Sequence, residues 1–127
     1  MAQLVTEQII TNREGESLPL NLDVIKSFEY RCEATRRDIL EALFRYGRGH
    51  AGPSLSQVEI LITLYLQELR LDPQDPKWPA RDRFILSKGH GALGYYAVLA
   101  QRGLIQHEEL STFESLRVSA PRLPVQL

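Results

Sequence analysis

Two stretches of this chain decide its fold: GHAGPSLS, residues 49–56, and DRFILSKGHGALGYYAVLA, residues 82–100. Each places one histidine in a glycine-flanked turn, and a helix-forming segment follows directly. Glycine next to a histidine at a helix start lets the backbone approach a ligand closely, and the free N–H groups of such a helix attract anions. Both stretches therefore point to a bound ligand, with an anion as the typical case.

The second turn follows a short apolar run, residues 84–86, which is bounded by charge on one side and by Ser-Lys-Gly on the other. Such a run predicts a buried parallel strand around residues 83–87. Strand, glycine turn and helix form the layout of ligand loops at the carboxyl end of a parallel strand. His90 in this turn is a candidate hydrogen-bond donor or proton carrier, because histidine titrates near neutral pH. A capping residue, or a buried histidine with satisfied hydrogen bonds, is the alternative.

The first turn holds His50, followed by Gly52 and Pro53. Gly52 relaxes the turn and Pro53 stiffens it. A helix predicted to begin at Ser54 or Ser56 would direct its positive end toward this loop. A phosphate group fits such a position, so His50 and Gly52 are candidate binding residues. Strings of this kind also occur as ordinary turns, and that alternative stays open.

A long first helix is predicted by apolar residues at three- and four-residue spacing. Asn21 or Asp23 is a suitable cap at its start, and Gly47 ends it. One face of this helix is expected to be buried, and its residues are Ile25, Phe28, Cys32, Thr35, Ile39, Leu43 and Tyr46.

The remaining chain predicts further helices separated by one loop. Ser56 and Glu59 have the spacing of a capping box at the start of the second helix. Three residue–proline pairs within residues 71–80 predict an extended loop, because a residue before proline avoids the helical region. A helix is predicted over residues 91–102, and a last short one over residues 107–116.

The composition is that of an ordinary globular chain. The 127 residues are enough for one compact domain, with 43% hydrophobic and 24% charged residues. The formal net charge of −1 argues against a nucleic-acid-binding protein, which normally carries a basic patch. No stretch has the roughly 20 apolar residues that a membrane helix needs, and the N-terminus lacks the pattern of a secretion signal. We therefore expect a cytoplasmic protein without a membrane partner.

The sequence contains no recognisable metal or nucleotide motif. The single cysteine, Cys32, excludes a disulfide framework and a cysteine-rich zinc site, and its helical position predicts burial. The histidines lack the spacings typical of zinc ligands, and His107, beside two glutamates, is expected on the surface. No metal ligand is therefore predicted on this chain. Strings of the types GxSxG, GxGxxG and GxxxxGK[ST] are absent as well.

Taken together, these strings resemble the transketolase family of thiamine-diphosphate enzymes. The matching features come in family order: an early amphipathic helix, GHAGPSLSQVEILITLYLQEL, DPQDPKWPARDRFILSKGHGALGYYAVLAQRG, and an EELSTF helix. The resemblance covers about residues 21–116, and it is closest to members encoded as separate N-terminal and C-terminal subunits. The implied fold class is α/β, an N-terminal fragment of the thiamine-diphosphate-binding fold that is mostly helical with one buried parallel strand.

The resemblance also implies an activity, the transfer of a two-carbon ketol unit between sugar phosphates. Thiamine diphosphate and Mg²⁺ are the implied cofactors. His50 would contact the diphosphate and the sugar, with Gly52 beside it, and His90 would hydrogen-bond the hydroxyls of the donor ketose. His50 and His90 are thus the catalytic candidates. The implied partners are sugar phosphates, a second copy in a homodimer and a C-terminal transketolase subunit, without nucleic acid.

Later strings of the family do not occur in this sequence, among them the GDG…N motif that binds Mg²⁺. We expect an N-terminal arm at residues 1–20, a partial domain at 21–116 and a divergent tail at 117–127, as in a truncated subunit. Such a chain is expected to be inactive alone and marginally stable, because a lone strand leaves backbone groups unpaired. The alternative is a non-catalytic helical remnant or interaction module of the same fold.

Overall fold

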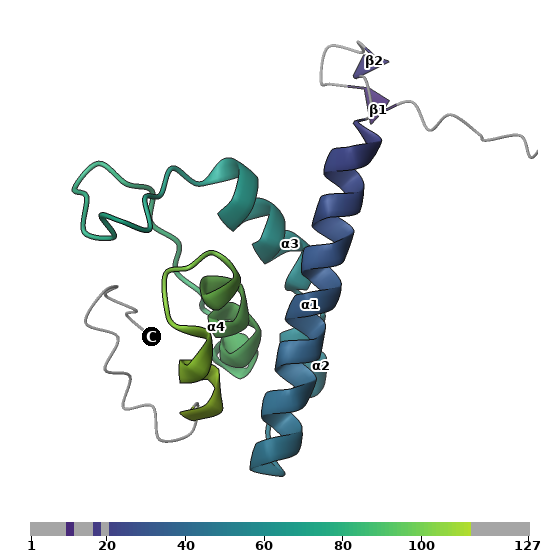
Figure 1. Ribbon diagram of the computed structural model, residues 1–127, viewed down its shortest axis with the longest axis vertical. Coiled ribbons are helices and arrows are strands. Elements are labelled where there is room, and N and C mark those ends of the chain that lie inside the picture. Colours follow the sequence, from purple (N-terminus) through teal and green to yellow (C-terminus); the bar gives the residue numbers. More distant parts are fainter. Residues whose placement is uncertain (1–9, 12–16, 19–20, 113–127) are drawn as a thin grey trace, which may run out of the picture.

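The structure is a computed structural model that describes residues 10–11, 17–18 and 21–112. Its α-helices are α1 (Leu22–Tyr46), α2 (Ala51–Leu55), α3 (Val58–Thr63) and α4 (Ala92–Gln101). A π-helical turn, η1 (Leu64–Glu68), continues α3, and two 3₁₀ segments are η2 (Gly89–Gly91) and η3 (His107–Thr112). Strands β1 (Ile10–Thr11) and β2 (Ser17–Leu18) pair antiparallel beyond the N-terminal end of α1 (Figure 1).

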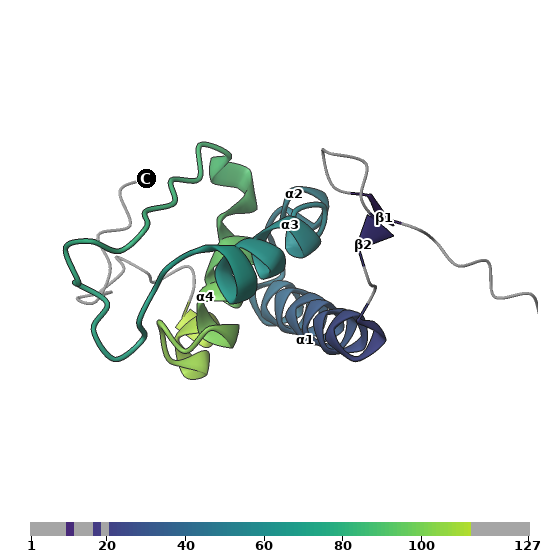
Figure 2. The same ribbon diagram turned by 90° about the horizontal axis from the view of Figure 1, so that it is seen from above.

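Helix α1 begins and ends as the sequence predicts. The side-chain oxygen of Asn21 accepts hydrogen bonds from the backbone N–H groups of Asp23 at 3.1 Å and Val24 at 3.3 Å. Gly47 ends the helix with a φ of 68°, a conformation that favours glycine. The other helices pack against one side of α1, as seen along its axis in Figure 2. Its buried residues are Cys32, Thr35, Ile39 and Ala42.

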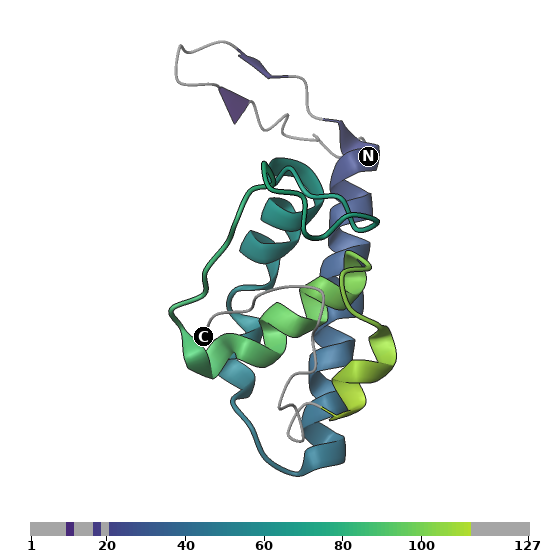
Figure 3. The same cartoon turned by 90° about the vertical axis from the view of Figure 1, so that its left-hand side faces the viewer.

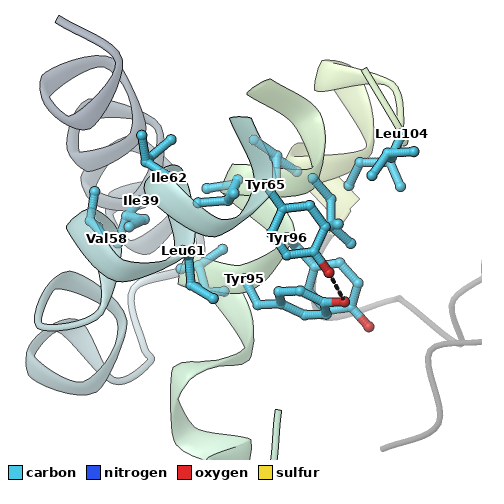
Figure 4. Packing of buried hydrophobic residues seen from close by; sticks show 14 of the residues in the cluster. Ile39, Val58, Leu61, Ile62, Tyr65, Tyr95, Tyr96 and Leu104 are labelled. Carbon is cyan, nitrogen blue, oxygen red and sulfur yellow. Dashed lines mark hydrogen bonds between the residues drawn. The ribbon is translucent and has the colours of Figure 1, made fainter. Parts of the chain in front are cut away.

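Helix α4 is the centre of the core. It crosses α1 obliquely (Figure 3) and also contacts α2, α3 and η3. Every residue from Leu93 to Leu99 is buried. The hydroxyl of Tyr65 on η1 and the hydroxyl of Tyr95 on α4 share a hydrogen bond of 2.6 Å (Figure 4). Burial raises the pKa of both phenols. The core residues contributed by α1 and α3 include Ile39, Val58, Leu61 and Ile62.

The predicted second helix is divided into separate pieces. Helix α2 already begins at Ala51, and Ser56 lies between α2 and α3, where its Oγ donates to the carbonyl of Pro53 at 3.3 Å. Glu59 binds the guanidinium of Arg36 on α1, so the predicted capping box is wrong. The guanidinium of Arg36 carries a full positive charge, whereas the backbone N–H of a capping box is neutral, so the ion pair adds an attraction between opposite charges.

The predicted parallel strand at residues 83–87 is also wrong. These residues form neither helix nor strand, and the only sheet in the described ranges is the β1–β2 pair. Phe84 and Leu86 pack partly against the core, whereas Ile85 is 73% exposed. A parallel strand exists only when a neighbouring strand pairs with it, and the described residues supply no such neighbour. The described part of the chain is thus mostly helical, without the strand expected of it.

The loop at residues 71–80 contains no helix or strand, as predicted. Hydrogen bonds between Arg70 and Asp82, here called the Asp82–Arg70 clasp, join its two ends. The carboxylate of Asp82 accepts hydrogen bonds from the backbone N–H of Arg70 at 2.8 Å and from its guanidinium at 2.9 and 3.3 Å. These hydrogen bonds hold the pKa of Asp82 below its usual value. The clasp joins the chain before the loop to the chain that leads to the second histidine turn.

Parts of the predicted organisation fall outside the described residues. Of the arm at residues 1–20, only the short hairpin strands are described, and the tail at 117–127 is not described. The last predicted helix, 107–116, is observed as η3 up to Thr112. Among the helices that the structure describes, none has the length and apolar character needed to cross a membrane.

Candidate functional site

The two candidate histidines lie side by side. The ring centroids of His50 and His90 are 4.7 Å apart, and the rings meet edge to face at 80°. His50 is the residue directly before α2, and His90 lies in η2, directly before α4. Because α2 contacts η2, two turns that are distant in the sequence present their imidazoles at one place.

The surface around these rings is open. Both imidazoles are exposed, and so is Gly52, where an added Cβ would meet no atom within 4 Å. Gly89, next to His90, is equally open. A hollow of about 610 Å³ lies elsewhere, between α1 and α3. The histidines therefore form an accessible surface, on which a ligand can reach both rings.

The histidine turns are positively charged. Residues 42–58 and residues 83–107 contain basic side chains and no aspartate or glutamate. The ammonium group of Lys88, two residues before His90, donates to the hydroxyl of Ser56 at 3.0 Å. A positively charged side chain beside the rings attracts ligands of negative charge. Since α2 has only five residues, these side chains, rather than the helix dipole predicted from the sequence, would attract an anion.

Close packing joins the two turns behind the histidines. The buried side chain of Gln57 donates its amide N–H to the carbonyl of Gly91. A Cβ on Gly91 would lie 2.6 Å from Nε2 of Gln57, and a Cβ on Gly94 would lie 2.5 Å from the carbonyl oxygen of Ser54. These glycines are needed for the contact between α4 and the α2–α3 region. The sequence pattern predicted that the glycines on both sides of His90 let a ligand approach the backbone. In the structure Gly91 instead allows helix α4 to pack closely, whereas Gly89 borders open space.

This packing was not predicted from the sequence, although a signal for it exists. Residues three apart share one face of a helix, and Gly91 and Gly94 have that spacing. A pair of small residues on one face permits a close approach of another backbone. Gln57 lies between Ser56 and Glu59 of the predicted capping box, and its exposure of 7% shows that it faces inward.

The other residues with chemical potential lie outside this surface. Cys32 is buried, as predicted, and burial raises the pKa of its thiol. His107 is exposed, as predicted, and pairs with Asp38 of α1 at 2.9 Å. Within the described ranges, no group of three or more His, Cys, Asp or Glu residues is placed to hold a metal ion.

Comparison with known proteins identifies a relationship. The family model described as "Transketolase, thiamine diphosphate binding domain" matches residues 29–126. The chain is 44% identical over 110 residues to an apulose-4-phosphate transketolase subunit of Actinobacillus succinogenes, which covers 85% of this chain and 39% of that protein. It is 43% identical over 84 residues to a 6-deoxy-6-sulfo-D-fructose transketolase subunit of a Clostridium species, covering 66% of this chain and 30% of that protein.

A similarity to a transketolase of Mycoplasma genitalium extends over 77 residues at 38% identity, covering 61% of this chain and 12% of that protein. The chain thus spans well under half the length of each of these relatives. The family match covers most of the chain and includes both histidine turns. This chain therefore belongs to the transketolase family and matches its thiamine diphosphate binding domain.

Proposed function

We propose that this chain is the N-terminal, diphosphate-binding part of a thiamine-diphosphate-dependent transketolase that transfers a two-carbon ketol unit between sugar phosphates. The observation that carries the proposal is the 4.7 Å approach of the His50 and His90 rings on an open surface. Such convergence of imidazoles from separate turns gives one ligand two adjacent nitrogen donors. The proposed domain is residues 21–116, which contain both turns.

The residues around the histidines fit the anionic end of the cofactor. The diphosphate requires N–H donors and positive charge, and His50, His90 and Lys88 offer both at one surface. Gly52 leaves the adjoining space open. Mg²⁺ requires oxygen ligands, commonly carboxylates, and no acidic cluster lies among the described residues. We therefore assign to this surface the diphosphate and sugar contacts, and not the Mg²⁺ site.

The cofactor, when bound, supplies the carbanion chemistry of the reaction. This chain contributes binding, orientation and proton handling. In the proposal, His50 contacts the diphosphate and the sugar, and His90 donates to the hydroxyls of the donor ketose. A neutral imidazole carries one N–H and one lone pair, so each ring is able to receive or return a hydroxyl proton. Lys88 neutralises part of the negative charge.

The proposed activity needs further protein, so the chain is inactive alone in this proposal. Two of the relatives above are named as subunits, which supports a separately encoded partner. Helix α1 exposes Tyr30 at 74%, and it exposes Leu40 at 52% and Phe44 at 89% four residues apart on one face. Neighbouring exposed apolar residues mark protein interfaces. The proposed partners, in the cytoplasm, are a second copy of this chain and a C-terminal transketolase subunit.

Calorimetry with thiamine diphosphate and Mg²⁺ tests this proposal. We expect binding heat when the chain is mixed with a C-terminal transketolase subunit, and little or none for the chain alone. His50→Asn should weaken the affinity for thiamine diphosphate about 10- to 150-fold, because loss of one charge-assisted hydrogen bond costs about 1.5–3 kcal/mol. His90→Asn should bind the cofactor like the wild type, because the proposal places His90 on the hydroxyls of the donor ketose. His107→Asn is the matched control and should bind normally, since His107 pairs with Asp38 instead.

The absence of binding heat in both conditions would overturn the proposal. That outcome would favour the second candidate, a non-catalytic helical remnant or interaction module. The exposed apolar side chains on α1 are compatible with this candidate as well. An equal loss of affinity in the His107→Asn variant would show that the effect does not arise at the two histidine turns.

A further inference from the structure

We propose that Gln57 is a positioning residue, which holds the His90 turn against the α2–α3 junction and thereby sets the contact between the two histidine rings. The importance of this contact for catalysis rests on the proposed function. The contact itself is a property of the chain, so it is measurable without cofactor or substrate.

The position of Gln57 connects the two halves of the site. Gln57 lies at the junction of α2 and α3, seven residues after His50, and is 7% exposed. Its amide donates a hydrogen bond to the carbonyl of Gly91, the residue directly after His90. One side chain therefore ties the helix that follows the first histidine to the turn that carries the second, across 34 positions of sequence.

The fit around this side chain is tight on the side of the second turn. A Cβ on Gly91 would lie 2.6, 2.8 and 2.9 Å from three atoms of the Gln57 amide group, and a Cβ on Gly94 would lie 3.0 Å from its Nε2. The amide thus occupies a slot that only glycine leaves open. A buried amide is costly without a hydrogen bond, so its bond to Gly91 defines one arrangement where an apolar side chain would allow several.

The exposed histidine turn depends on such a tether. Lys88, Gly89 and His90 are all exposed, so little packing of their own side chains fixes them. Gly91 is the first buried residue after them. Small displacements of a binding group lower the rate of an enzyme reaction, because reacting groups need a defined geometry. Gln57 is therefore the buried point where the core holds the His90 turn, beside the exposed hydrogen bond from Lys88 to Ser56.

The test uses the full chain and nuclear magnetic resonance. In the wild type, an edge-to-face approach of the two rings should give a nuclear Overhauser cross-peak between ring protons of His50 and His90. Gln57→Met has a similar length but no donor, and should lose this cross-peak while circular dichroism and the unfolding transition stay close to wild type. Gly91→Ala should reproduce the loss from the opposite side, because its Cβ displaces the Gln57 amide. This second variant decides the matter if Gln57→Met does not fold.

Gly89→Ala is the matched control in the same turn, since its Cβ meets no atom within 4 Å, and it should keep the cross-peak. A folded Gln57→Met variant with the wild-type cross-peak would overturn the proposal. Failure of the wild type to bind the cofactor would contradict the proposed function and would leave the cross-peak comparison intact.

Discussion

Helix α4 and the histidine turn before it are neighbours in sequence and opposites in environment. Residues 93–99 are all buried, whereas residues 87–90 are all exposed. The change occurs at Gly91, which is buried against Gln57. Neighbouring residues therefore have different roles: the buried helix stabilises the fold, and the exposed turn presents groups that a ligand can reach.

The two regions also depend on different forces. The core of α1, α3 and α4 is held by apolar burial, which is non-directional and spread over many contacts. The exposed turns are placed by a few directional bonds, such as Lys88 to Ser56 and Gln57 to Gly91. Substitutions in the core should therefore change the free energy of unfolding, whereas those in the turns should mainly change the histidine geometry.

The largest effect is expected in the core. Ile62→Ala removes a fully buried side chain next to α4, and we expect the free energy of unfolding to fall by about 2–5 kcal/mol. Urea denaturation measures it. The matched control is Ile60→Ala on the same helix, where Ile60 is 64% exposed and a change within about 0.5 kcal/mol is expected. Equal losses for the two variants would contradict the assignment of the core face.

A smaller effect is expected at the boundary between the regions. In Gly94→Ala the new Cβ would lie 2.5 Å from the carbonyl oxygen of Ser54. Overpacking costs about 1–3 kcal/mol, which exceeds the gain of about 0.5–1 kcal/mol from replacing glycine by alanine in a helix. The variant should therefore be less stable than wild type in thermal unfolding. Gly52→Ala, with open space around its Cβ, is the control and should show no comparable loss.

The N-terminal start of α1 is a third place to test the comparison. Asn21→Ala removes the side-chain cap from the N–H groups of Asp23 and Val24 and should cost about 1 kcal/mol. Ser27→Ala, at an exposed position inside the same helix, should change stability by less than about 0.5 kcal/mol. A cap is local, so the ring contact between His50 and His90 should persist, and its loss would be evidence against the separation of the two regions.

The smallest effect concerns pH and the Asp82–Arg70 clasp. The pKa of Asp82 is lowered in the folded state, so its contribution to stability is present above the unfolded pKa of about 3.9 and is lost as pH falls through the lower folded value. A chemical-shift titration should show Asp82 titrating at lower pH in the wild type than in Arg70→Gln. The stability difference between wild type and Asp82→Asn should shrink as the solution is acidified. A difference that grows instead would reverse the predicted sign.

The local elements of the fold were predictable from the residues alone. The cap at Asn21, the end at Gly47 and the buried face with Cys32 follow from spacing and side-chain chemistry within a few residues. The two histidine turns were also recognisable, and their resemblance to the transketolase family implied that both contact one cofactor and its sugar. The prediction of a strand at residues 83–87 was wrong because an apolar run only makes a strand possible. A strand also needs a second strand beside it to pair with.

By itself, the sequence determined where the long first helix lies, which of its faces is apolar, and to which family the chain belongs, because capping, periodicity and family strings are local features. Only the tertiary structure decided that Gln57 binds Gly91, that Gly94 approaches Ser54, and that Glu59 turns to Arg36. The physical reason is that these contacts join residues far apart in the chain. Their energies exist only after the helices pack, so a local pattern such as the spacing of Gly91 and Gly94 indicates a close approach but does not identify the partner.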